Sequence, residues 1–262
     1  MVHQLVIVGG GNMGAALIQG LLRAGTLGPS DLAITETLEG RRAELATMFS
    51  GVTIDAEVPE AAGAVIAVKP GDVGAAVAAA ARAGARRILS IAAGVTIRRL
   101  EEAAGADVAV VRAMPNTPAL IGQGASAIAG GQRATEDDLA WAEGILGSVG
   151  TVERVGEAQL DAVTALSGSG PAYVFLVAEA LVDAAVAVGL ARPVATRLTT
   201  QLLVGSSALL AERGEPAALR AMVTSPGGTT AAGLSALEAH AVRAAFADAI
   251  RAATARSIEL GA

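Results

Sequence analysis

Apolar residues follow two different patterns along the first half of the chain. Short β-branched runs that end near glycine, proline or asparagine predict buried strands at residues 3–10, 31–36, 63–70, 86–94 and 106–116. Apolar residues that recur every three or four positions predict helices at residues 12–25, 39–51, 72–84, 96–105 and 135–150. The run at 126–131 predicts a weaker sixth strand. Strands that alternate with helices predict a parallel sheet with right-handed crossover connections.

The strand pattern ends near residue 156. Beyond it, helical spacing covers residues 157–166, 171–190, 193–214, 216–223 and most of the chain after 228. We therefore expect an α/β domain at residues 1–156, followed without a flexible linker by an all-α domain at residues 157–262.

The most apolar predicted helix, residues 171–191, carries Glu179 and Asp183. A membrane span of about 20 residues rarely holds two acids, so this segment predicts a buried or interface helix and no membrane association. Two such apolar helices exceed what one small helical core can hide, and we expect a homodimer or a higher homo-oligomer built on dimers. The N-terminus lacks the pattern of a signal peptide, and we expect a cytoplasmic protein.

Composition excludes several classes of chemistry. The chain has no cysteine and only two histidines, His3 and His240, so thiolate nucleophiles are excluded and no metal site is expected. The formal net charge of -6 argues against a general nucleic-acid binder, which needs a basic surface. Aromatic residues make up only 2% of the chain, so the core consists of small and branched aliphatic side chains.

The first predicted strand is followed by the turn "GGGNMG", which opens the first predicted helix. It contains the spacing Gly9-x-Gly11-x-x-Gly14, with Asn12 and Met13 in between. In a dinucleotide site, the first glycine permits the tight turn, the second lets the backbone approach a pyrophosphate, and the third permits close packing of helix on sheet. The alternative is an ordinary glycine-rich turn, but the strand–turn–helix context favours a dinucleotide site.

In dinucleotide sites, the residues at the end of the second strand determine the preference for NAD or NADP. Glu36 favours the ribose hydroxyls of NAD, because its charge repels a 2′-phosphate. Thr35, Thr37, Arg41 and Arg42 offer groups for that phosphate instead, although the arginines equally fit a solvated helix face. The sequence therefore leaves the choice between NADPH and NADH open.

Three unusual turns follow three further strands: "AVKP" at 67–70, "IAAG" at 91–94 and "MPNTP" at 114–118. Lys69 is the only lysine in the chain, and Asn116 is one of two asparagines. Ligands bind outside the carboxyl ends of parallel strands, so we expect these turns to line one crevice beside the glycine turn. The alternative is that the single lysine lies there by chance.

Two further turns lie in the helical half. "SGSGPAY" at 167–173 and "SPGGTT" at 225–230 each precede a predicted helix, where exposed amides suit a carboxylate. Plain helix capping is the alternative for both. For 225–230 we favour an anion site, because two glycines and two threonines exceed what a cap needs.

Taken together, the stretches "GGGNMG", "AVKP", "IAAGVTI", "RAMPNTPA", "SGSGPAY" and "VTSPGGTTAAGL" resemble the pyrroline-5-carboxylate reductase family in order and approximate spacing. The resemblance covers nearly the whole chain. It implies an N-terminal Rossmann domain that binds the dinucleotide and a C-terminal helical domain that interlocks between subunits. It also implies reduction of 1-pyrroline-5-carboxylate to L-proline by NADPH or NADH, the last step of proline biosynthesis.

The resemblance also implies residue roles. The implied cofactor-binding residues are Gly9, Gly11, Asn12, Met13, Gly14, Thr35, Glu36, Ala67, Val68, Lys69, Pro70, Ala92, Ala93 and Asn116. The implied substrate-binding residues are Ser225, Gly228, Thr229 and Thr230. Thr230 is the implied catalytic residue, because it would hydrogen-bond the ring nitrogen of the substrate. Glu36 departs from the family members that prefer NADPH, which often carry Ser or Thr there without an acid.

Two other functions fit the pattern less well. A different imine reductase or a β-hydroxyacid reductase shares the two-domain plan, but the latter usually carries a lysine in the helical domain, and this chain has none there. A regulatory protein that senses a dinucleotide would bind the cofactor without consuming it.

Overall fold

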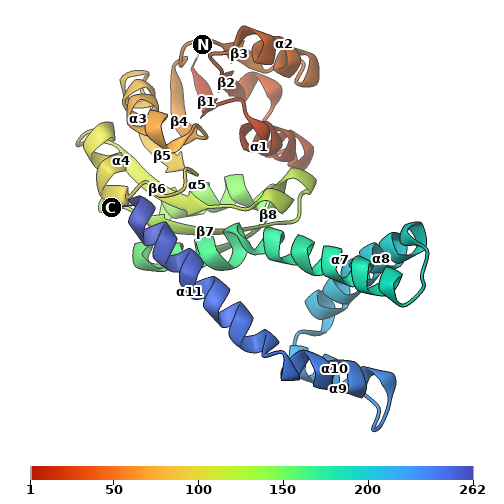
Figure 1. Ribbon diagram of the computed structural model, residues 1–262. Helices are drawn as coiled ribbons and strands as arrows, with labels where there is room; N and C mark the ends of the chain where they lie inside the picture. Colours follow the sequence, from red (N-terminus) through yellow and green to blue (C-terminus); the bar gives the residue numbers. More distant parts are fainter. Residues whose placement is uncertain (1, 262) are drawn as a thin grey trace. The chain divides into compact units, whose positions relative to one another are not determined.

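The computed structural model describes residues 2–261 and divides into two compact units. One unit, which we call the sheet unit, runs to Ser169 and includes the chain from Ala252 onward. The other, the helical unit, is Gly170–Arg251. Figure 1 shows the elements of both units in chain order. The domain boundary at 156/157 remains a prediction, because a compact unit need not coincide with a domain.

The sheet unit contains a single eight-stranded sheet in the order β3-β2-β1-β4-β5-β6-β7-β8. Its strands are β1 (His3–Val8), β2 (Leu32–Thr35), β3 (Thr53–Asp55), β4 (Ala61–Ile66), β5 (Arg87–Ser90), β6 (Ala109–Met114), β7 (Gly124–Gly130) and β8 (Gly150–Arg154). The strand order reverses direction between β1 and β4, which creates the crevice where doubly wound sheets bind ligands. The predicted Rossmann architecture is therefore confirmed.

Two features of the sheet differ from the prediction. β7 runs antiparallel to β6, whereas every other neighbouring pair is parallel. β3 and β8 were not predicted. β3 has three residues, none of them buried, and β8 is a largely exposed strand at the edge of the sheet, so neither carries an apolar run.

Helices cover both faces of the sheet. They are α1 (Asn12–Ala24), α2 (Glu39–Met48), α3 (Val73–Arg82), α4 (Ile97–Ala104) and α5 (Glu136–Gly147). Shorter segments are the 3-10 turns η1 (Pro29–Asp31), η2 (Pro70–Asp72), η3 (Thr117–Ile121) and η4 (Glu157–Gln159), the helix α6 (Leu160–Val163) and the π turn η5 (Thr164–Gly168).

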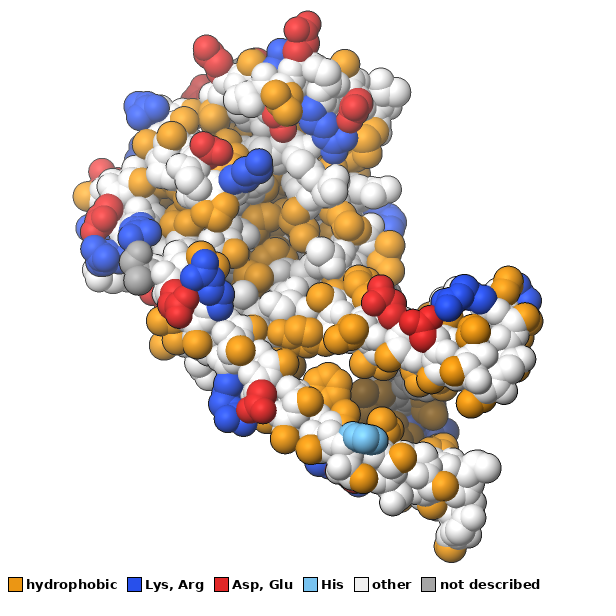
Figure 2. Space-filling model, in the orientation of Figure 1, with side chains coloured by type: hydrophobic (Ala, Val, Ile, Leu, Met, Phe, Trp, Pro, Cys, Tyr) orange, Lys and Arg blue, Asp and Glu red, His pale blue; other side chains and the backbone are white. Residues whose placement is uncertain are grey.

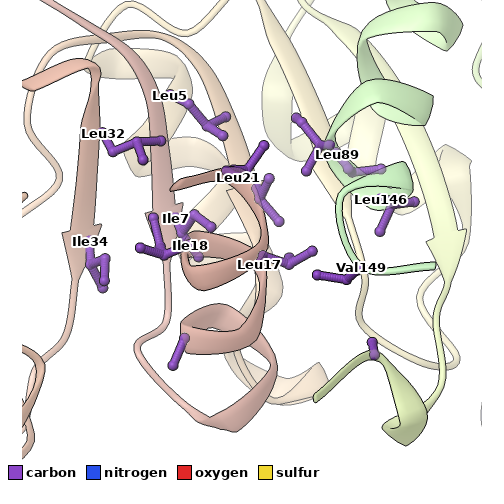
Figure 3. Close-up of a cluster of buried hydrophobic side chains, with 14 of the residues drawn as sticks. Leu5, Ile7, Leu17, Ile18, Leu21, Leu32, Ile34, Leu89, Leu146 and Val149 are labelled. Atoms are coloured by element: carbon purple, nitrogen blue, oxygen red, sulfur yellow. The ribbon is translucent and has the colours of Figure 1, made fainter. Parts of the chain in front are cut away.

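Alternation along the strands builds a separate core on each face. On β1, Leu5 and Ile7 point into a cluster with α1, α2 and α5, whereas Val6 and Val8 point into a cluster with α3 and α4. Figure 3 shows Leu17 and Ile18 of α1 beside Ile7 in the first of these clusters. The two cores fix the carboxyl ends of the strands, and with them the turns that carry the candidate site.

The helical unit buries almost nothing within one chain. It contains α7 (Gly170–Ala187), α8 (Arg192–Arg213), α9 (Pro216–Met222), α10 (Thr229–Ala239) and the first half of α11 (Val242–Gly261). Of its residues, only Ala195 and Thr199 are buried. Hydrophobic side chains gather on the face of this unit seen in Figure 2. Exposed large examples are Phe175, Leu176, Leu198, Leu202 and Leu237.

Within residues 2–261, one helical stretch, Glu157–Ala187, is long and apolar enough to cross a membrane by length and composition alone. The same property is expected of a helix that packs against a second copy of the chain. We predicted that this segment is either a buried helix or an interface helix. α7 has no buried residue in the isolated chain, so of these two predictions the interface helix is the one that remains.

Candidate active site

The glycine turn is fixed by contacts that leave no room for side chains. Gly9 has φ +111° and donates its N–H to the Thr35 carbonyl at 2.8 Å. A Cβ on Gly9 would lie 2.6 Å from the Ala67 carbonyl oxygen, and a Cβ on Gly14 would collide with the carbonyl oxygen of Gly9. The turn therefore packs directly against the "AVKP" segment, which joins two of the sequence motifs.

Gly11 differs from its neighbours because its missing side chain faces open space. A Cβ built on Gly11 would meet no atom within 4 Å. Gly11 is the N-cap of α1, and no side chain caps the helix there. Asn12 is exposed, while Met13 packs partly against the core. The amides at the start of α1 are therefore available to an anion.

The carboxylate of Glu36 lies on the glycine turn. Its Oε2 accepts the Gly10 N–H at 3.2 Å, and its Oε1 accepts the Leu38 N–H at 2.9 Å. The Thr37 hydroxyl lies 3.4 Å from the same Oε1. These contacts hold the negative charge at the end of β2, beside the crevice.

The groups predicted to offer a phosphate site are engaged elsewhere. Thr35 is buried, and its hydroxyl donates to the Glu57 carbonyl at 3.3 Å. Arg41 donates to the Gly10 carbonyl at 2.8 Å and pairs with Glu44 at 2.7 Å. Arg42 donates to two backbone carbonyls, those of residues 36 and 37, at 3.0 and 2.7 Å.

A hollow of about 740 Å³ opens beside the ends of β1, β2 and β4. The residues that line it come from these strand ends, the loop after β3 and one face of α3: Val8, Thr35, Thr37, Ala56, Glu57, Val58, Val68, Asp72, Ala75, Ala76, Ala79, Arg82 and Ala83. Its walls are mostly apolar, and its volume lies within the range of cofactor pockets.

Lys69 lies at the rim of this region. It is exposed and forms the N-cap of η2, with Pro70 at the first position of that turn. Within residues 2–261, its ammonium group makes no hydrogen bond or ion pair. A lone cation of this kind is free to contact an anionic ligand.

The turn at 91–94 is held from several sides. Ala92 is buried and its N–H donates to the Ser90 hydroxyl at 3.4 Å, whereas Ala93 is exposed. Gly94 has φ +74°, and a Cβ there would lie 3.3 Å from the Leu260 carbonyl near the end of α11. The end of α11 therefore packs on this turn.

Glu157 binds the start of α4 and a buried arginine of β6, a role that was not predicted from the sequence. Its Oε1 accepts the Ile97 N–H at 2.6 Å and the guanidinium of buried Arg112 at 3.0 Å. A charged residue within the buried strand β6 was the available signal for Arg112. Nothing local in the sequence pointed to Glu157, which is 60 positions from Ile97.

The side chain of Asn116 hydrogen-bonds to the protein backbone at both of its polar atoms. Its Oδ1 accepts the Ala125 N–H at 2.9 Å, and its Nδ2 donates to the Ser167 carbonyl at 3.1 Å. The side chain therefore fastens the start of β7 to η5. This geometry gives Asn116 a bracing role at the strand end, and leaves its contact with a nicotinamide as a prediction.

The segment 167–173 leads into the predicted helix, since α7 begins at Gly170, but it lacks the exposed helix start that we expected there. The chain forms the π turn η5, with the Ser169 N–H bonded to the Thr164 carbonyl at 2.8 Å, and then continues into α7. A Cβ on Gly168 would lie 2.5 Å from the Met114 methyl group. The glycine therefore serves close packing on the end of β6, and capping does not explain it.

The bend at 225–230 is built differently. Gly227 has φ +68°, Gly228 is the N-cap of α10, and no side chain caps that helix. A Cβ on Gly228 would collide with the Ser225 hydroxyl. Within residues 2–261, neither the Thr229 nor the Thr230 hydroxyl has a hydrogen-bond partner. The Gly228 N–H donates to the Ser225 carbonyl at 3.1 Å, so the N–H groups offered to an anion are those of Thr229 and Thr230. Together with the two hydroxyls, they favour the anion site over a plain cap.

The part of the chain that the structure describes contains no group of three or more His, Asp or Glu able to hold a metal ion.

The chain is similar to known proteins over nearly its whole length. Residues 157–260 match the family described as pyrroline-5-carboxylate reductase dimerisation, and residues 4–94 match NADP oxidoreductase, coenzyme F420-dependent. Pyrroline-5-carboxylate reductase of Mycobacterium tuberculosis strain H37Rv is 44% identical over 285 residues, covering 98% of this chain and 96% of that protein. The enzyme of Synechocystis is 43% identical, covering 98% of each.

Solved structures give the same result. A pyrroline-5-carboxylate reductase from Coxiella burnetii superposes with a TM-score of 0.93 at 33% identity, covering 100% of both chains. The Plasmodium falciparum enzyme, solved with NADP bound, superposes with a TM-score of 0.84 at 29% identity, covering 99% of this chain and 98% of that one. The chain therefore belongs to the pyrroline-5-carboxylate reductase family, and it reduces 1-pyrroline-5-carboxylate to L-proline with NAD(P)H in proline biosynthesis.

Proposed function

We propose that the hydride-transfer site of this reductase combines the strand-end turns of the sheet unit with the bend at 225–230. One observation carries the cofactor half of the proposal: the protein itself fills the space at Gly9 and Gly14 but leaves Gly11 open. This is the arrangement that a pyrophosphate on the start of α1 requires. In domain terms, residues 1–156 bind the dinucleotide, and residues 157–262 bind the substrate and form the oligomer.

The residues present fit NAD(P)H. The amides at Gly11, Asn12 and Met13 receive the pyrophosphate, and the hollow beside β2 and β4 receives the adenosine. Ala67, Val68, Lys69 and Pro70 border the ribose and nicotinamide side, together with Ala92 and Ala93 of the neighbouring turn. When bound, the cofactor supplies a hydride.

The protein's part in the reaction is mainly positioning. The Thr229 amide and the Ser225 hydroxyl bind the substrate carboxylate, Gly228 lets the carboxylate approach the backbone at the start of α10, and the Thr230 hydroxyl hydrogen-bonds the ring nitrogen. A protonated cyclic imine is already electrophilic, so no strong general acid is needed. Orientation alone supplies about 7–11 kcal/mol in favourable cases.

The site is completed by a second copy of the chain. The helical unit exposes its apolar side chains, and residues 157–260 match a dimerisation family. We propose a homodimer, or a larger assembly built on dimers, that works in the cytoplasm without nucleic-acid or membrane partners.

The test is oxidation of NADH and NADPH by the purified protein with 1-pyrroline-5-carboxylate. Thr230→Val should lower kcat/KM by a factor that corresponds to about 1–3 kcal/mol, since it removes one hydrogen bond to the substrate. Thr47→Val is the matched control, because Thr47 is an exposed hydroxyl on α2 that donates to the Ala43 carbonyl. Wild-type kinetics for Thr230→Val would refute its role, and cofactor binding without turnover would favour a sensing protein.

A further inference from the structure

The sequence left open which nicotinamide cofactor this chain selects, and the structure adds the position of one charged group that bears on this choice. The deciding group is the carboxylate of Glu36. It lies at the end of β2 and is held by the N–H groups of Gly10 and Leu38. A carboxylate has about four acceptor positions, so these two bonds leave capacity for the hydroxyl groups of a ribose.

A 2′-phosphate finds the opposite environment there. It has no hydroxyl to donate at that position and carries charge of the same sign as Glu36. The residues that line the hollow beside β2 include two acids, Glu57 and Asp72, and one cation, Arg82, and the cation Lys69 directly follows the lining residue Val68. These four charges cancel, so the group that opposes an additional phosphate is the carboxylate of Glu36 itself.

The cations of the neighbouring helix are bound to the protein. Arg41 donates to the Gly10 carbonyl and to Glu44, and Arg42 donates to the carbonyls of residues 36 and 37. Both guanidinium groups therefore support the backbone around Glu36. Each keeps further N–H donors, so the carboxylate of Glu36 and not a lack of cations is what opposes a 2′-phosphate here.

We propose that Glu36 makes this enzyme select NADH over NADPH. The proposal rests on the cofactor site proposed above. It sets the chain apart from the Plasmodium falciparum structure, which holds NADP. The competing interpretation is that Glu36 only braces the turn, in which case removing its charge would change stability and leave cofactor choice unaltered.

Equilibrium binding to the full-length protein separates these interpretations. We expect the wild-type Kd for NADH to be lower than that for NADPH by roughly tenfold, which corresponds to about 1.4 kcal/mol. Glu36→Gln keeps the size of the side chain and removes its charge, so the Kd ratio should approach unity, mainly through tighter NADPH binding. Glu39→Gln is the matched control: it removes an exposed acid from the first turn of α2, and the ratio should stay at the wild-type value.

A second measurement needs no variant. On the wild-type protein, 5′-AMP should bind more tightly than adenosine 2′,5′-bisphosphate, since only the latter places a phosphate beside Glu36. Equal affinities for the two adenosine ligands, or an unchanged Kd ratio in a folded Glu36→Gln, would overturn the proposal. Failure of both NADH and NADPH to bind would instead refute the cofactor site itself, so the two proposals fail in distinguishable ways.

Discussion

The two compact units of this chain differ in how far they bury their hydrophobic side chains within one chain. The sheet unit buries two aliphatic clusters, one on each face of its sheet. The helical unit, 82 residues long from Gly170 to Arg251, buries only Ala195 and Thr199. Both segments are rich in Ala, Leu and Val, so composition does not explain the contrast.

The difference shows where each unit obtains its stability. Buried apolar area contributes roughly 25 cal/mol per Å², and the sheet unit obtains this within one chain. The helical unit must obtain it from another chain, which agrees with the dimerisation family matched by residues 157–260. On the site proposed above, the cofactor half would belong to the self-sufficient unit, and the substrate half to the unit that depends on a partner.

The largest expected effect comes from charging the helical unit. Leu198→Glu combined with Leu202→Glu places two charges one turn apart on exposed apolar positions of α8. We expect loss of the dimer and of nearly all reductase activity, because the apolar surface can no longer pack. Light scattering after size-exclusion chromatography measures the mass.

The control for that variant is Met48→Glu, which adds a charge at an exposed apolar position of the sheet unit. It should leave the mass and the activity unchanged. A doubly charged α8 variant that remains dimeric and active would show that these leucines lie outside the interface.

The glycine turn allows the sheet unit to be tested with a matched pair. Gly14→Ala drives a Cβ into the Gly9 carbonyl and should cost about 1–3 kcal/mol of unfolding free energy. Gly11→Ala meets only open space, so it should change stability by less than about 1 kcal/mol yet weaken dinucleotide binding. Thermal melts and nucleotide titrations measure the two effects, and the reverse pattern would contradict a pyrophosphate on Gly11.

Asn116 tests the bracing within the sheet unit. Asn116→Ala removes both hydrogen bonds and leaves the Ser167 carbonyl without its donor, which should cost about 1–3 kcal/mol. Asn116→Asp keeps the acceptor for the Ala125 N–H but sets a carboxylate oxygen against the Ser167 carbonyl, so it too should lose stability at pH 7. Chemical denaturation measures both, and equal stability of all three proteins would remove the bracing role.

Lys69→Ala should act on the cofactor and hardly on the fold. The ammonium group is exposed and has no partner within residues 2–261, so thermal stability should change little. If it contacts the cofactor, KM for the cofactor should rise. An unchanged KM would exclude Lys69 from the site.

The smallest effect is expected at the edge strand β8. Arg154 bonds to Glu136 and Glu143, and its hydrogen bonds lower the pKa of the Glu143 carboxyl below its ordinary value. A lowered folded-state pKa stabilises the protein above the ordinary carboxyl pKa, and this stabilisation is lost as the pH falls through the lowered value. Arg154→Gln should therefore slightly reduce the melting temperature at pH 7 and not at strongly acidic pH. Added salt should shrink the difference, since the pair is exposed.

The site was predictable wherever one short segment carries its own geometry. The glycine turn before α1 and the bend with two glycines before α10 could be recognised from sequence, because a positive φ and close backbone approach both require glycine. Asn116 and the segment 167–173 were recognised as unusual, yet their mutual contact spans 51 positions and was not foreseen. The sequence thus shows that a residue is unusual more readily than it shows which distant residue it contacts.

The sequence by itself determined the long helices and the apolar strands, where the glycine turn lies and which chemistry is excluded by the missing cysteines, but not the short or exposed strands β3 and β8. Only the tertiary structure decided the antiparallel pairing of β6 and β7, the seat of Glu36 on the Gly10 amide and the support of Ile97 by Glu157. The physical reason is range. Hydrophobic period and backbone preference act within about a dozen residues. The contacts of Glu36 and Glu157 instead join residues 26 and 60 positions apart, and the direction of β7 depends on how the chain turns after β6, so all of these exist only once the sheet has packed.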